Sequence, residues 1–122
     1  MLPFFVEISI DFPTFNRYIQ IERSNRGWAS SVKKKYTNDV KMFLIGKKIS
    51  EFPIQVEFIW NIKSELRDID SFSFAKKCIF DGMVNCGFIP DDRLKYIKKT
   101  IDRVKKSKKD GVLLVITKYK EE

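Results

Sequence analysis

The run of residues 54–63, which follows Pro53, constrains the fold most. Its side chains alternate between apolar and polar, and Val56, Phe58 and Trp60 fall on one side. An alternation with a period of two is typical of a β-strand that buries one face. Such a strand needs neighbouring strands and a layer that covers its apolar side. The chain is therefore expected to contain a sheet with a covered face.

Three further segments are predicted to be strands of this sheet. Residues 4–12 alternate in the same way, residues 93–104 are expected to be extended from Tyr96 onward, and residues 112–118 form a final apolar strand. The lysine-rich loop between the last two strands ends in an Asp-Gly turn, so we expect these two strands to form a β-hairpin. Residues 15–26 are predicted to be irregular.

Two helices are predicted between the strands. Residues 28–44 repeat their apolar positions at close to 3.6 residues, which is typical of an amphipathic helix. Residues 72–85 form the second helix, for which Ser71 or Ser73 is the candidate N-cap. Gly87 is expected to end this helix, because glycine adopts the left-handed conformation at low cost.

These elements predict one domain that spans residues 1–122. The expected order is β-α-β-α-β-β, and the expected fold is α+β, a compact domain with a mixed β-sheet and two main helices. A chain of this length can bury a single core.

The composition indicates a polyanionic partner. Lysine and arginine total 24 against 16 acidic residues, so the formal net charge is +8. Such an excess fits nucleic acid or an anionic membrane surface. No apolar run approaches the roughly 20 residues that a membrane-spanning helix needs, and no secretory signal is visible. We therefore expect a cytoplasmic protein that binds nucleic acid.

The cysteines and the lack of histidine limit the chemistry. Cys78 and Cys86 lie eight residues apart in a predicted helix, about 12 Å, which is too far for a disulfide. We expect two buried, reduced thiols in a reducing compartment. Without histidine, neither a Ser-His-Asp nor a Cys-His nucleophile can be built. Hydrolysis by this chain would have to depend on carboxylates, lysine and metal.

Four carboxylates form two clusters in this basic chain. Asp68 and Asp70 follow a strand, and if the chain is still extended there, both side chains point to one face. Asp91 and Asp92 follow the second helix. Bare carboxylates repel phosphate, but a bound Mg²⁺ could bridge them to a phosphodiester and polarise it. Asp91 and Asp92 would join this site only if the chain folds back after the helix. Helix caps are the alternative role for such acids.

The order of several short motifs resembles the RusA family of Holliday junction resolvases. The matching segments are Arg-Asp-Ile-Asp at residues 67–70, Lys-Cys-Ile-Phe-Asp-Gly-Met-Val at residues 77–84, and Gly-Phe-Ile-Pro-Asp-Asp at residues 87–92. The resemblance covers about residues 67–97. It implies a Mg²⁺-dependent, structure-selective endonuclease that resolves four-way DNA junctions by paired symmetric nicks in recombination and repair.

The resemblance also implies roles for the acids. Asp68, Asp70 and Asp92 match the family carboxylates that hold Mg²⁺, and Asp91 matches a supporting acid beside them. Asp81, in the middle of the helix, is expected to have a structural role.

The basic residues of the motif match less completely. Arg67 matches a basic residue beside the site, and Lys77 best matches the family's active-site lysine, with Lys76 as the competitor. Ser71 stands where the family has asparagine, and the segment from Asp70 to the lysine is about three residues longer than in its best-known members. These departures leave the choice between the two lysines open.

Further lysines are expected to contact DNA phosphates without reading sequence. The residues predicted to bind DNA are Arg67, Lys76, Lys33, Lys34, Lys35, Lys98, Lys99, Lys105 and Lys106. The aromatic residues Phe72 and Phe74 are expected in the core, with base stacking as the alternative.

A junction with near two-fold symmetry needs two equivalent sites, so we expect a homodimer. Two alternatives stay open. One is a catalytically impaired protein that binds branched DNA, and the other is a nuclease for other branched or flap DNA.

Overall fold

The computed structural model describes residues 2–121 and has an α+β fold. Its elements are β1 (Phe4–Ile8), α1 (Phe15–Ser24), α2 (Arg26–Leu44), β2 (Ile54–Ile62), the 3₁₀ helix η1 (Ile69–Phe72), α3 (Ser73–Asn85), β3 (Ile97–Lys106) and β4 (Gly111–Lys118). The strands form one mixed sheet in the order β1-β4-β2-β3. The α+β class and the mixed sheet are confirmed, although the described residues form three α-helices instead of two.

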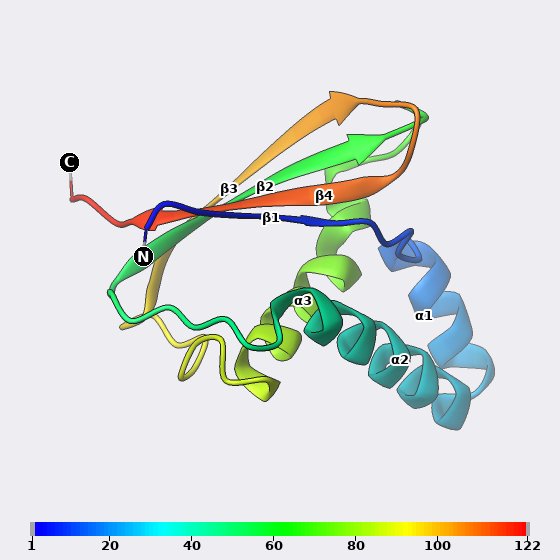
Figure 1. Cartoon of the computed structure of the whole chain (residues 1–122). Coiled ribbons are helices and arrows are strands. Elements are labelled where there is room, and N and C mark those ends of the chain that lie inside the picture. Colours follow the sequence, from blue (N-terminus) through cyan, green and yellow to red (C-terminus); the bar gives the residue numbers. More distant parts are fainter. Residues whose placement is uncertain (1, 122) are drawn as a thin grey trace.

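The helices lie on one side of the sheet (Figure 1). Burial along β2 alternates as predicted, and Val56, Phe58 and Trp60 are buried beneath the helical layer. Cys78 and Met83 of α3 belong to the same core. Among residues 2–121, no helix lies on the opposite side of the sheet, so the core is a single layer between sheet and helices.

The predicted hairpin between the last two strands is wrong. β3 pairs with β2 in parallel, whereas β4 pairs with the other edge of β2 in antiparallel orientation. The loop between them passes over the end of β2, where Ser107 N–H donates to the Ile62 carbonyl (2.8 Å) and Lys63 N–H donates to Asp110 Oδ1 (3.0 Å). A parallel pair needs a crossover. Here α3 forms that crossover and brings β3 to the free edge of β2.

The segment predicted to be irregular, residues 15–26, contains α1 and the first residue of α2. Thr14 caps α1, because its side-chain oxygen accepts from Arg17 N–H at 3.1 Å. Asn25 then caps α2 by accepting from Trp28 N–H at 2.9 Å. Two consecutive caps separate two helices where the sequence suggested a loop followed by one helix.

The start of α3 also differs from the prediction. Neither Ser71 nor Ser73 caps the helix, because η1 runs directly into it. The Ser73 hydroxyl instead donates to the Asp70 carbonyl at 2.8 Å. The end is as predicted, since Gly87 has a positive φ of 78° just after the last turn.

Cys78 and Cys86 are both free thiols, but of the two predicted buried thiols only Cys78 is buried, because Cys86 lies at the end of α3 and is partly exposed. Cys78 is completely buried in the core, and this burial raises the pKa of its thiol to about 11. Among residues 2–121, none of the helices combines the length and the apolar character that a bilayer crossing requires.

Candidate functional site

Asp68 and Asp70 lie on a surface groove, called here the acid groove, with a volume of about 340 Å³. It forms where the segment that leaves β2 meets the start of α1. The acid groove is lined by Thr14, Phe15, Asn16, Leu66, Arg67, Asp68, Asp70 and Ser71. Both carboxylates of the Arg-Asp-Ile-Asp motif line this one groove. The extended chain on which the predicted shared face depended is not present, because Asp70 belongs to the 3₁₀ helix η1.

The N-terminus of α1 forms one wall of the acid groove. Thr14 accepts from Arg17 N–H, so the N–H groups of Phe15 and Asn16 at the first turn have no acceptor within the helix. The N-terminal end of a helix also carries a partial positive charge. This wall can therefore donate to a phosphate beside two carboxylates that would otherwise repel it.

Two buried polar atoms on the acid groove have no partner. Arg67 Nε and Ser71 Oγ are inaccessible to solvent and make no hydrogen bond within the part of the chain that the structure describes. The Arg67 guanidinium lies over the Phe72 ring, 4.7 Å from its centroid. Buried polar groups are normally paired, so these two atoms are exceptions beside the groove.

The carboxylates of Asp68 and Asp70 are also unpaired. Across residues 2–121, no lysine or arginine forms a salt bridge with either of them. Asp81 of α3, by contrast, is paired with Lys33 and Lys77. The two acids of the motif therefore line the groove without a basic partner.

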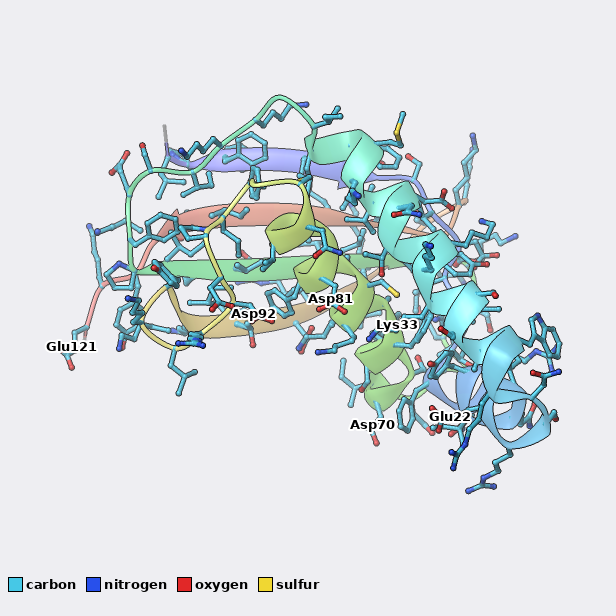
Figure 2. All side chains as sticks on the ribbon, turned by 90° about the horizontal axis from the view of Figure 1, so that it is seen from below. Glu22, Lys33, Asp70, Asp81, Asp92 and Glu121 are labelled. Carbon is cyan, nitrogen blue, oxygen red and sulfur yellow. The ribbon has the colours of Figure 1, made fainter. Side chains whose placement is uncertain are left out.

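Asp92 does not join this pair within one chain. Figure 2 shows Asp70 and Asp92 at different ends of α3, with Asp81 along the helix between them. The 13 residues of α3 span about 20 Å. No group of three acidic or cysteine side chains that could hold a metal forms among residues 2–121. The expected return of the chain after α3 does not occur, because the loop leads to β3 at the far end of the sheet.

Asp91 is engaged in its own loop. Its carboxylate accepts from Asp92 N–H at 2.8 Å and lies 3.0 Å from Arg93 Nε. These contacts fix the turn that precedes β3. Asp91 therefore has a structural role in this turn, whereas the side chain of Asp92 is exposed.

Lys76 is held on the side of α3 that faces β3. Its Nζ lies 3.2 Å from Asp102 Oδ2 and 5.2 Å from the centroid of the Phe58 ring. Asp102 also accepts from the Trp60 indole N–H at 3.0 Å. Lys76 is thus part of a half-buried network that joins α3 to the sheet.

Lys77 points to the opposite side, toward α1 and α2. Its Nζ lies 3.7 Å from Asp81, which also lies 3.3 Å from Lys33 Nζ. The Lys77 side chain is 59% exposed. Of the two candidate lysines, Lys77 is the one that can move toward a bound phosphate.

The remaining predicted DNA-binding lysines lie on two elements. Lys33, Lys34 and Lys35 belong to α2, where Lys35 forms a 2.8 Å ion pair with Asp39 that raises the pKa of the lysine. The other four lie at the two ends of β3, one of the two edge strands of the sheet. They are Lys98, Lys99, Lys105 and Lys106. The basic residues therefore extend over the helical layer and one sheet edge.

The contribution of α1 to the acid groove was not predicted. Phe15 and Asn16 line the groove and belong to residues 15–26, which the sequence predicted to be irregular. The signal that could have found them is Thr14, a good N-cap residue, followed by apolar side chains at helical spacing.

Comparisons with models of known protein families and with curated proteins find no match to this chain. The resemblance to the RusA family therefore depends on the short motifs alone.

Proposed function

We propose that this protein is a Mg²⁺-dependent endonuclease that cleaves four-way DNA junctions by paired nicks. The observation that carries the proposal is the acid groove. It combines the unpaired carboxylates of Asp68 and Asp70 with the N-terminus of α1 on one concave surface. Carboxylates for a metal and N–H donors for a phosphate are the two requirements of metal-assisted phosphodiester hydrolysis.

The donor set of the acid groove fits Mg²⁺. This ion prefers oxygen ligands, keeps several waters, and is usually bound by one or two carboxylates together with substrate phosphates. Asp68 and Asp70 would hold it, and Asn16 offers an amide oxygen on the facing wall. When bound, the ion would polarise the scissile phosphate and lower the pKa of a coordinated water.

The side chains around the groove would orient the DNA. The first-turn N–H groups of α1 would bind oxygens of the scissile phosphate, and the Arg67 guanidinium, fixed on Phe72, would contact a neighbouring phosphate. Lys77 would leave Asp81 and donate to the charge that develops at the leaving oxygen.

Paired nicks need two acid grooves, so the proposal includes a homodimer with two-fold symmetry. If two α3 helices pack in antiparallel orientation, the end that carries Asp92 in one chain lies beside the end that carries Asp68 and Asp70 in the other. We propose that Asp92 completes the metal site of the partner in this way. This arrangement accounts for an acid that cannot reach the acid groove of its own chain.

The test is a cleavage assay on an end-labelled four-way junction with Mg²⁺ or with EDTA. Symmetric nicks that need Mg²⁺ and disappear in Asp68→Asn support the proposal. Tight junction binding without cleavage would identify a branched-DNA-binding protein instead. Faster cleavage of a flap than of the junction would indicate a nuclease for other branched DNA.

A further inference from the structure

A second groove lies next to the acid groove, on the outer side of the helical layer. We call it the aromatic groove, and its volume is about 270 Å³. It is lined by Phe15, Tyr18, Glu22, Lys33, Ser73, Phe74 and Lys77. Phe15 lines both grooves and forms the ridge between them. A chain of nucleotides that leaves the acid groove past Phe15 would enter the aromatic groove.

The floor of the aromatic groove is a fixed stack of rings. Tyr18 and Phe74 are stacked with centroids 4.3 Å apart and an interplanar angle of 23°. The rings of Tyr36 and Phe74 meet edge-to-face, with their centroids 6.1 Å apart, and Phe74 is only 4% exposed. The ring of Tyr18 is therefore held in place by its neighbours, with one side toward the groove.

Phe15 differs from these rings. It is 40% exposed and stacks on no other aromatic ring in the described part of the chain. A half-exposed ring at the first position of a helix, beside a fixed Tyr18, offers two aromatic surfaces for a flat ligand. Nucleobases bind single-strand-binding proteins in this way, because every base has a π-face.

The charged residues of the aromatic groove suit a nucleotide. Asp81 holds Lys33 and Lys77 on the same wall, because its carboxylate oxygens lie 3.3 Å from Lys33 Nζ and 3.7 Å from Lys77 Nζ. Each ammonium has three N–H donors and gives only part of this capacity to Asp81, so both can also bind a phosphate. Glu22 supplies an acceptor. A carboxylate can accept from the exocyclic amino group of cytosine or adenine, which thymine lacks.

We propose that the aromatic groove binds an unstacked nucleobase of the strand that passes through the acid groove. The base stacks on Phe15 and Tyr18, and its phosphate contacts Lys33 and Lys77. Glu22 favours bases with an exocyclic amino group over thymine. This inference rests on the proposed nuclease function for the identity of the strand, but binding of the base itself needs no metal.

The test uses the full chain and a short single-stranded oligonucleotide with one 2-aminopurine, in EDTA. Stacking is expected to quench the fluorescence of 2-aminopurine on binding. Phe15→Ala should weaken binding at least about tenfold and abolish the quenching, because base–aromatic stacking dominates sequence-tolerant single-strand binding. Phe5→Ala is the matched control, since Phe5 is an exposed ring, 61% accessible, on β1 at the far side of the sheet. Equal effects of the two variants would overturn the inference.

A second measurement tests the preference for a base. Oligo-dC is expected to bind more tightly than oligo-dT, and Glu22→Ala should remove this difference. Glu7→Ala on β1 is the control and should leave the difference unchanged. If oligo-dC and oligo-dT bind equally to the unmodified protein, the role of Glu22 is wrong.

The two proposals can fail separately. Quenching without cleavage of any junction would support the base site and contradict the nuclease function. Mg²⁺-dependent cleavage with unquenched 2-aminopurine would support the nuclease function and contradict the base site.

Discussion

Gly82 of α3 lies against Val40 of α2 with no room for a side chain between them. A Cβ atom on Gly82 would be 2.8 Å from Val40 Cγ1 and 3.2 Å from the Thr37 carbonyl oxygen. The backbones of the two helices can approach this closely only because residue 82 is glycine. The contact fixes the distance between α2, which carries Lys33, and α3, which carries Lys77.

Gly82→Ala is therefore expected to lower the free energy of unfolding, even though alanine is the better helix former. Overpacking a well-filled core costs about 1–3 kcal/mol. Urea denaturation measures this loss. The double variant Gly82→Ala/Val40→Ala should lose less than the sum of the single variants, because the truncated valine leaves room for the new methyl group. Additive losses would show that the close contact is not the cause.

Asp70→Asn is expected to abolish junction cleavage and to leave junction binding intact or tighter. The substitution keeps the shape of the side chain but removes one charge that would hold the metal and repel phosphate. Gel-shift and single-turnover cleavage assays on the same junction measure both effects. Asp39→Asn, at an exposed ion pair on α2, is the control and should cleave normally. Full Mg²⁺-dependent activity of Asp70→Asn would remove this residue from the site.

Lys77→Ala and Lys76→Ala are expected to act on different properties. Lys77→Ala should slow single-turnover cleavage by orders of magnitude with little change in stability, because its side chain is largely exposed. Lys76→Ala should lower the free energy of unfolding by about 1 kcal/mol, because it removes a half-buried partner of Asp102. Cleavage by Lys76→Ala should be close to normal. The reverse ranking in the cleavage assay would assign the active-site role to Lys76.

A site shared between two chains predicts complementation. Asp70→Asn and Asp92→Asn homodimers should each be inactive. In a mixed dimer, one site combines both substitutions and the other site has neither, so mixing the two variants should restore single nicks. A supercoiled plasmid with a cruciform would then be nicked and not linearised. If the mixture stays inactive although subunits exchange, Asp92 does not act across the dimer.

The buried thiol of Cys78 predicts a loss of stability at alkaline pH. Its pKa is raised to about 11 in the folded protein, whereas an unfolded thiol has a pKa near 9. Above pH 9 the unfolded chain releases this proton and the folded chain keeps it, so stability falls as the pH rises from 9 to 11. The loss is about 2 kcal/mol at pH 11. Urea denaturation of Cys78→Ala should show a flatter dependence on pH over this interval.

The strands and the core could be predicted from the sequence because alternation reports which face of a strand is buried. Val56, Phe58 and Trp60 are buried as the pattern required. The same pattern does not report which strand is the neighbour. The loop with the Asp-Gly turn suggested that β3 and β4 are adjacent, but α3 places β3 on the other edge of β2.

The candidate site was predictable only where it is local in sequence. Asp68 and Asp70 both line the acid groove, although Asp70 belongs to η1 and not to the extended chain on which the prediction depended. The position of Asp92 depends on where the loop after α3 leads, which is a property of the whole fold. The wall formed by α1 was missed, because this helix has only 10 residues and Asn25 separates it from the longer helical pattern of α2.

The strand order also determines when the sheet can form. β1 pairs with β4 alone, and β2 pairs with β3 and β4. Every ladder therefore includes a strand from the last part of the chain, and residues 4–96 contain no pair of strands that are neighbours in the sheet. During synthesis, β1 and β2 cannot pair with their neighbours in the sheet until residues 97–118 have left the ribosome. Until then the helices are the only regular structure that the growing chain can form.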